Sequence, residues 1–225
     1  MDISVKISAL VKDAAPDLRV LTLQANVQNS PTSSEFKLLM EEMADEIRRN
    51  YNIPDINKRP GIAATRAAYK KMGKDPNRYR PSQEQLMRRV VNGKELYFIN
   101  HVVDVFNYVS LWCGHSIGAF DVDKINGETL TLGIGQAGEP YEGIGRGVLN
   151  IEGLPVYRDA TGGVGTPTSD NERTKISATT THLLVCINMY GDESTVEDIK
   201  SMTEKLLTRF CEVSDIRWSL VRSED

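Results

Sequence analysis

Residues 99–121 read INHVVDVFNYVSLWCGHSIGAFD, and this stretch decides how the chain folds. Apolar residues recur through it at helical spacing and predict an internal helix. They are Phe98, Val102, Phe106, Val109 and Cys113. A smaller, more polar stripe lies on another face of the same helix, and we expect it to face a cavity. That stripe consists of Val103, Asn107, Ser110 and Gly114.

The segments on either side mix strands and helices without a regular alternation. Val5 to Val11 and Leu18 to Val27 predict two strands joined by a turn. Further strands are predicted at Thr129 to Ile134, Val148 to Ile151, Leu154 to Tyr157, Leu183 to Tyr190 and Ile216 to Val221. Helices are predicted after capping boxes at Thr32 to Glu35, Ser82 to Gln85 and Ser194 to Glu197, and from Ile62 to Lys71. We therefore expect one α+β domain over residues 1–225.

Composition narrows the class of protein. The chain has 225 residues and 40% hydrophobic content, enough for an ordinary globular core. It contains no apolar run of about 18 residues, so we expect no membrane partner. Cys113, Cys186 and Cys211 are odd in number and embedded in apolar patterns, which favours free thiols over disulfides. These features predict a soluble cytoplasmic protein.

Several common catalytic, metal-binding and cofactor-binding patterns are absent from the sequence or incomplete. Gly133 to Gly138 has the spacing of a dinucleotide loop, but the sequence after it, EPYEGIGRG, cannot open the required helix. His101, His115 and His182 show no metal-ligand spacing with one another or with the cysteines. No nucleophile elbow or Walker loop occurs. We therefore expect neither a metal nor a cofactor, and the patterns leave the catalytic residues unassigned.

Charge is concentrated in one segment. The net charge of −4 gives no general reason to expect DNA or another polyanion as a partner. The segment between Ile56 and Lys94, however, contains eleven basic residues and only two acidic ones, Asp75 and Glu84. The basic residues are Lys58, Arg59, Arg66, Lys70, Lys71, Lys74, Arg78, Arg80, Arg88, Arg89 and Lys94. The segment is either a solvated charged face or a surface that contacts phosphates.

The opening stretch also carries a family resemblance. It resembles the signature of the editing domain in the β-subunit of phenylalanyl-tRNA synthetase, which the chain matches more loosely from Pro60 to Tyr190. The matching elements are Arg80-Pro-Ser82, Val102-Val-Asp104, Asn107-Tyr-Val109 and Ala119-Phe-Asp121, followed by Gly138-Glu139, Asp159, Gly162-Gly163 and Ser169-Asp170. The segment starting RPGIAATRAAYKK resembles freestanding members of the same family. The resemblance implies a compact α+β sandwich with a central pocket.

The resemblance also implies a reaction. The family domain hydrolyses the ester of tRNA charged with the wrong amino acid, a second sieve that restores accuracy. It implies aminoacylated tRNA as a partner, with the amino-acid moiety as the small-molecule ligand. We expect the arginines of the basic segment to contact that tRNA: Arg66, Arg78, Arg80, Arg88 and Arg89. The competing hypotheses are a non-catalytic module that binds tRNA or a small molecule, and a structural subunit of a larger complex.

Some site residues follow from the family match. Asn107 matches an asparagine that contacts the amino group of the ligand, unless its amide instead ties neighbouring backbone together. Gly162 and Gly163 match a glycine pair that lines the pocket, or form a plain turn. Asp104 and Asp121 also match, and we expect them to be structural anchors.

The chain departs from the family pattern in two places. Gly118 stands where the family has a histidine. The missing side chain would leave room for a bulkier ligand. No acid stands near Ala178 to Thr180, where the family has the glutamate that recognises tyrosine, so the sequence does not predict tyrosine specificity. Thr179 and His182 would offer a hydroxyl and an imidazole to a different amino acid, or form a polar strand edge.

Overall fold

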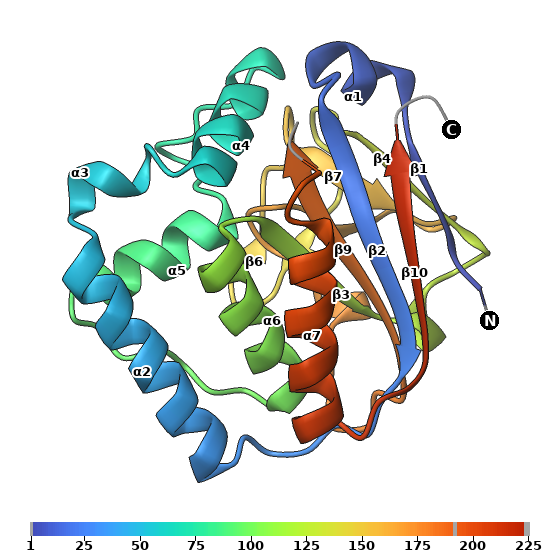
Figure 1. Cartoon of the computed structure of the whole chain (residues 1–225). Coiled ribbons are helices and arrows are strands. Elements are labelled where there is room, and N and C mark those ends of the chain that lie inside the picture. The colour runs from blue at the N-terminus through green and yellow to red at the C-terminus, as the bar shows by residue number, and fades with distance from the viewer. Residues whose placement is uncertain (1, 191–192, 223–225) are drawn as a thin grey trace.

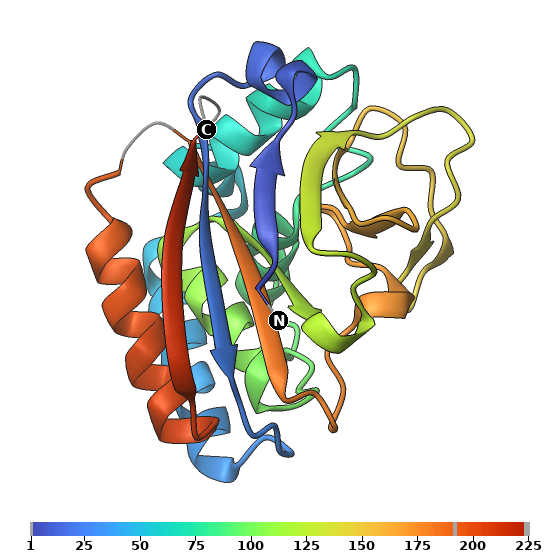
Figure 2. The same cartoon turned by 90° about the vertical axis from the view of Figure 1, so that its right-hand side faces the viewer.

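Two four-stranded sheets form the framework of the computed structural model, which describes residues 2–190 and 193–222 (Figures 1 and 2). The larger sheet has the order β10-β2-β9-β3, and all its neighbours are antiparallel. Its strands are β2 (Leu18–Asn26), β3 (Ser116–Asp121), β9 (His182–Tyr190) and β10 (Ser214–Arg222). The smaller sheet has the order β1-β4-β7-β8, with β1 and β4 parallel. Its strands are β1 (Ser4–Ile7), β4 (Thr129–Ile134), β7 (Pro155–Arg158) and β8 (Gly163–Gly165).

Helices cover one face of the larger sheet (Figure 1). They include α2 (Ser34–Asn50), α5 (Ser82–Val91), α6 (His101–Cys113) and α7 (Val196–Phe210). The shorter elements are α1 (Ala9–Ala14), α3 (Ile53–Ile56), α4 (Pro60–Lys71), the 3-10 turns Val122–Lys124 and Glu172–Thr174, and the hairpin of β5 (Glu142–Gly143) and β6 (Gly147–Val148). The α+β class is confirmed. No described helix is long and apolar enough to cross a bilayer.

The apolar sequence of β9 follows from its central position. Side chains of a strand alternate between faces, so a strand covered on both sides is apolar throughout. Leu184 and Cys186 pack between the two sheets. Val185 and Ile187 pack against the helices. One strand therefore belongs to two hydrophobic clusters, and it holds the sheets and the helical layer together.

Helix α6 has clear signals at both ends. The Asn100 side chain caps its start by accepting a hydrogen bond from the Val103 N–H at 3.0 Å. Gly114 ends it in the left-handed conformation with φ 79°, which favours glycine. The predicted apolar stripe is confirmed at Val102, Phe106 and Val109, which are buried.

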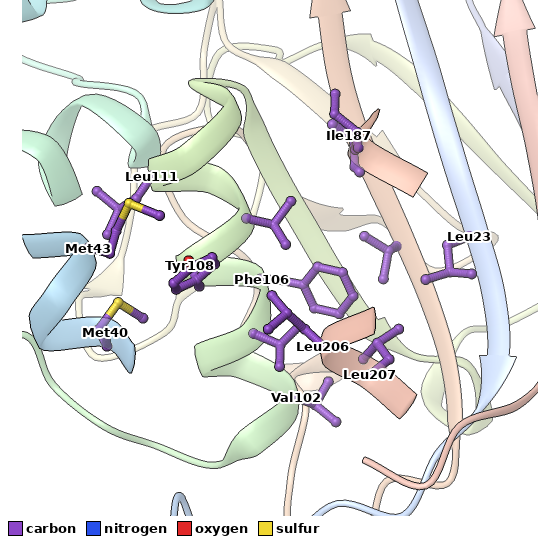
Figure 3. Packing of buried hydrophobic residues seen from close by; sticks show 14 of the residues in the cluster. Leu23, Met40, Met43, Val102, Phe106, Tyr108, Leu111, Ile187, Leu206 and Leu207 are labelled. Atoms are coloured by element: carbon purple, nitrogen blue, oxygen red, sulfur yellow. The ribbon is translucent and has the colours of Figure 1, made fainter. Parts of the chain in front are cut away.

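The buried side chains of α6 point toward two different layers. Figure 3 shows Val102 and Phe106 near Leu207 of α7, on the side of the sheet, whereas Tyr108 points toward Met40 of α2. All of these residues belong to one hydrophobic cluster. The helix is therefore internal, as the sequence predicts.

Several predicted boundaries are wrong. The strand predicted from Val5 to Val11 ends at Ile7, because Ser8 caps α1 and accepts from the Val11 N–H. β1 and β2 then join different sheets instead of forming a hairpin.

The helix caps differ from the predicted capping boxes. The cap of α2 is Ser33, which accepts from the Phe36 N–H at 3.2 Å. At α5 and α7 the N-caps are Pro81 and Thr195, and neither makes a side-chain cap bond. The strand predicted at Val148 to Ile151 is reduced to Gly147–Val148.

Candidate functional site

A cavity of about 350 Å³ opens beside α6, between that helix, α5 and the edge of β3. Three of the four residues of the predicted polar stripe line it: Val103, Asn107 and Ser110. The other lining residues are Ser82, Leu86, Ile99, Phe106, Ile117, Ala119, Ile144, Asp170, Lys175 and Ile176. Most of the wall is apolar, with a few polar groups, which is the usual make-up of a small-molecule site.

Asn107 contributes an amide with unused hydrogen-bonding capacity. It is partly buried and lines the cavity. Among the described residues, none forms a hydrogen bond with its side chain, whereas Ser110 on the same stripe donates to the His115 carbonyl oxygen at 2.8 Å. The amide therefore has both an acceptor and donors to offer a ligand.

Asp170 is the second polar group of the cavity, and sequence patterns gave it no role beyond a loose family match. Its Oδ2 accepts a hydrogen bond from the Ala119 N–H at 3.3 Å, on the edge of β3 that β9 does not cover. Although the residue keeps some exposure, burial of its carboxyl raises its pKa to about 8, against the opposing effect of that N–H.

Gly118 faces away from the cavity that its neighbours Ile117 and Ala119 line. A Cβ at this position would lie 2.7 Å from Cζ of Phe120 and 3.4 Å from Oδ1 of Asp170. Phe120 is fully buried between the sheets. The glycine therefore makes room for this ring and this carboxyl, and not for a ligand.

Replacing Gly118 by alanine or histidine is expected to lower the free energy of unfolding by roughly 1–3 kcal/mol, the usual cost of overpacking. Urea denaturation of Gly118→Ala, Phe120→Leu and the double variant measures the effect. Leucine removes the ring atoms that the new Cβ meets, so the double variant should lose less stability than the two single changes together. Strictly additive losses would show that the methyl group and the ring do not collide.

The glycine pair serves a turn and a close contact. Gly162 has φ 146°, and its N–H donates to Oδ1 of Asp159 at 3.1 Å in the turn between β7 and β8. A Cβ on Gly163 would lie 2.8 Å from the ring of Tyr141. Neither glycine lines the cavity with Asn107.

Thr179 and His182 are both exposed and lie outside this cavity. Nδ1 of His182 lies 2.9 Å from the Asp123 carboxylate, and the Thr179 hydroxyl lies 3.1 Å from that of Ser177. The structure therefore brings Asn107 alone, of the ligand-contact residues expected from the sequence, to the cavity wall.

Asp104 and Asp121 are hydrogen-bonded within the fold. The carboxylate of Asp104 accepts from the Thr32 hydroxyl and from the Ile99 N–H. That of Asp121 accepts from the Thr180 hydroxyl at 2.8 Å. These bonds are those of structural anchors, as expected.

Glu84 organises much of the basic segment from a position of zero exposure. Its Oε2 lies 2.8 Å from Nη1 of Arg66, and its Oε1 lies 2.8 Å from Nε of Arg88. Arg80 approaches the same carboxylate at 3.7 Å. The Arg66 and Arg88 side chains are only 12% and 21% exposed. Arg66 joins α4 to α5 through Glu84, whereas Arg88 joins α5 to Asn57, whose Oδ1 accepts a hydrogen bond from it at 3.0 Å.

The remaining arginines are more accessible. Arg78 is exposed and lies over the ring of Tyr79. Arg89 stacks on Tyr97, 4.0 Å from the ring centroid, and Nε donates to the Glu95 carbonyl oxygen. Of the five arginines expected to contact tRNA, Arg78 and Arg80 are the exposed ones.

The three histidines all lie away from the lining of the cavity. His101 is buried against Ser30 and Ser33, and burial lowers its pKa. Burial also lowers the pKa of His115, to about 4. Within residues 2–190 and 193–222, no group of three His, Cys, Asp or Glu side chains is placed to hold a metal ion.

The chain is similar to one family of domains and to parts of known proteins. The family model described as the B3/4 domain matches residues 64–213. The phenylalanine--tRNA ligase beta subunit of Protochlamydia amoebophila is 43% identical over 44 residues, which are 20% of this chain and 6% of that protein. The crystal structure of an N-terminal fragment of the phenylalanyl-tRNA synthetase beta-subunit from Pyrococcus horikoshii gives a TM-score of 0.45 at 12% identity. That superposition covers 98% of this chain and 51% of the other.

Proposed function

We propose that this protein hydrolyses mischarged aminoacyl-tRNA. The chain belongs to the B3/4 domain family, and the editing domain that its sequence resembles is related to this family. The observation that carries the proposal is the cavity beside α6. Its apolar wall suits an amino-acid side chain, and the Asn107 amide and the Asp170 carboxyl suit the polar end of such a ligand.

The proposed ester hydrolysis needs few catalytic groups. An aminoacyl ester is labile, so holding the α-ammonium group and orienting a water molecule against the ester accelerate its hydrolysis without a nucleophilic side chain. The Asn107 Oδ1 is a suitable acceptor for the ammonium group, and its side chain has no described partner to displace.

The test is incubation of the purified protein with a panel of tRNAs that carry cognate and non-cognate amino acids. We expect hydrolysis of a subset of mischarged tRNAs whose side chains are apolar, because the cavity wall is mostly apolar. The correctly charged tRNAs and the free amino acids serve as controls. Absence of hydrolysis across the whole panel would contradict the proposed activity.

A non-catalytic binding module is the second candidate, and the placement of the histidines favours it. None of His101, His115 and His182 lines the cavity, so no imidazole is available there to move a proton. The same panel separates the candidates, since a binding module would retain aminoacyl-tRNA on a filter without hydrolysing it.

We expect tRNA binding to depend on the exposed arginines of the basic segment. Arg78→Glu combined with Arg80→Gln should weaken binding and reduce the slope of log K against log salt by about one per lost phosphate contact. Glutamine is chosen at Arg80 because an acid there would face Glu84. Lys205→Glu, on an exposed position of α7, is the matched control. Unchanged binding over a full salt titration would remove this surface from the proposal.

A further inference from the structure

The segment that follows α5 presents its side chains to two sides. Residues 94–100 have no regular secondary structure. Leu96 and Phe98 line a hollow against α2, whereas Ile99 lines the cavity beside α6. Tyr97 belongs to neither lining and is 71% exposed. Single exposed apolar side chains are common on protein surfaces, and what distinguishes Tyr97 is how its ring is held.

An arginine of α5 holds the Tyr97 ring in place. The guanidinium carbon of Arg89 lies 4.0 Å from the ring centroid. Arg89 is itself fixed, because its Nε donates a hydrogen bond to the Glu95 carbonyl oxygen. The guanidinium covers part of the ring, and the high exposure of the residue shows that much of the remainder is open. An anchored and accessible aromatic ring is the kind of group on which unpaired bases of RNA stack.

The Arg89–Tyr97 pair adjoins the cavity. Ser82 and Leu86 of α5 both line the cavity, and Arg89 follows Leu86 by three positions on the same side of the helix. Three residues advance a helix by about 4.5 Å. On the neighbouring segment, Tyr97 precedes the cavity residue Ile99 by two positions. The pair therefore lies just beyond the cavity wall that Leu86 and Ile99 form.

We propose that the Arg89–Tyr97 pair is a stacking platform for the base of the 3′-terminal nucleotide of tRNA. The inference rests on the proposed function, in which the cavity receives the amino acid. The ester joins this amino acid to the ribose of the terminal nucleotide, and the base is attached to the same ribose. When the amino acid lies beside Asn107, the base lies within the length of one nucleoside of the cavity wall. The pair offers an anchored aromatic surface at that distance.

The charge around the pair suits a nucleic acid. Arg89 carries a permanent positive charge, and a guanidinium plane can itself stack on a base. The one acid in the sequence of residues 94–100 is Glu95, which lines the hollow on the side of α2 together with Leu96. Glu84, the acid of α5, is buried and paired with arginines. A ring beside a cation, with the nearby acids turned away or neutralised, fits a base and its phosphate better than an apolar protein surface.

The test compares binding of complete tRNA with binding of tRNA that lacks its 3′-terminal nucleotide. Both are uncharged, so hydrolysis does not intervene. Tyr97→Ala should weaken binding of the complete tRNA about 5- to 150-fold, the usual loss for one stacked base, and leave binding of the truncated tRNA unchanged. Tyr97→Phe should bind like the unmodified protein. Leu10→Ala, at an exposed apolar position of α1, is the matched control.

A tryptophan at the same position gives a direct readout of stacking. Tyr97→Trp keeps an aromatic platform and should keep the affinity for complete tRNA. Its added fluorescence, measured above that of Trp112 and Trp218, should be quenched by the complete tRNA and not by the truncated one. A ring that only fastens the segment to α5 would show no difference between the two tRNAs.

Different outcomes separate this inference from the proposed function. If the unmodified protein binds neither tRNA, the proposed function and the inference fail together. If it binds the complete tRNA and Tyr97→Ala binds it equally well, only the inference is overturned. Equal losses for the complete and truncated tRNAs would assign the ring to another part of the tRNA and would also overturn it. Binding through Tyr97 without hydrolysis of mischarged tRNA would support the platform and contradict the proposed hydrolysis.

Discussion

Replacing Glu84 by alanine is expected to lower the free energy of unfolding by about 3–5 kcal/mol, the usual loss when one partner of a buried ion pair is removed. The carboxylate has no exposure and pairs with both Arg66 and Arg88 at 2.8 Å. Without it, two mostly buried guanidinium groups lose their counter-charge. Arg66 would keep the Pro76 carbonyl oxygen, which accepts a hydrogen bond but does not neutralise charge.

Urea denaturation at two salt concentrations measures this loss. Glu41→Ala, at an exposed position of α2, is the matched control and should change stability by less than about 0.5 kcal/mol. Because the Glu84 pairs are buried, the loss should depend little on salt. A loss below about 1 kcal/mol, as for a surface ion pair, would show that the carboxylate is solvated.

The Glu84 cluster also illustrates what the sequence could and could not show. The i,i+4 spacing of Glu84 with Arg80 and with Arg88 is visible in the sequence and predicts pairing on one helix. The pairing with Arg66 joins α5 to α4, and no local pattern encodes it. A count of basic residues therefore overstates how many are available to a polyanion.

Helical periodicity carried the strongest predictions. It located α6, its buried stripe and the polar stripe that faces the cavity, because a 3.6-residue repeat fixes which side chains share a face. Gly114 left the polar stripe because it ends the helix in the left-handed conformation. Strand predictions were weaker near Ser8, where a side-chain cap turned an apolar run into a helix.

Only part of the candidate site could be predicted from the sequence. Asn107 was found because it sits on a periodic helix and within a family motif. Asp170 lies in an irregular segment after β8. Its bridge to Gly165 and its hydrogen bond to the Ala119 N–H place it at the cavity, and neither contact is visible in the sequence. Gly118 was misplaced because strand alternation puts it on the face opposite Ile117 and Ala119.

Asn107→Ala is expected to reduce the hydrolysis of a mischarged tRNA about tenfold to a hundredfold. The amide oxygen is proposed to accept a hydrogen bond from the α-ammonium group, and such charge-assisted bonds contribute about 1.5–3 kcal/mol. For the same reason, an N-acetylated aminoacyl-tRNA should already be a poor substrate of the unmodified protein. Loss in kcat/KM, measured under single-turnover conditions, gives the energy of the contact.

The design must separate ligand contact from support of the helix. Asn107 makes no described side-chain hydrogen bond, so its replacement by alanine should leave the melting temperature nearly unchanged. Asn50→Ala, at the exposed end of α2, is the matched control for the same chemical change. The N-acetylated substrate completes a cycle: it and Asn107→Ala remove the same bond, so their effects should not add. A folded Asn107→Ala protein that keeps full activity, or effects that add, would show that the amide does not contact the ammonium group.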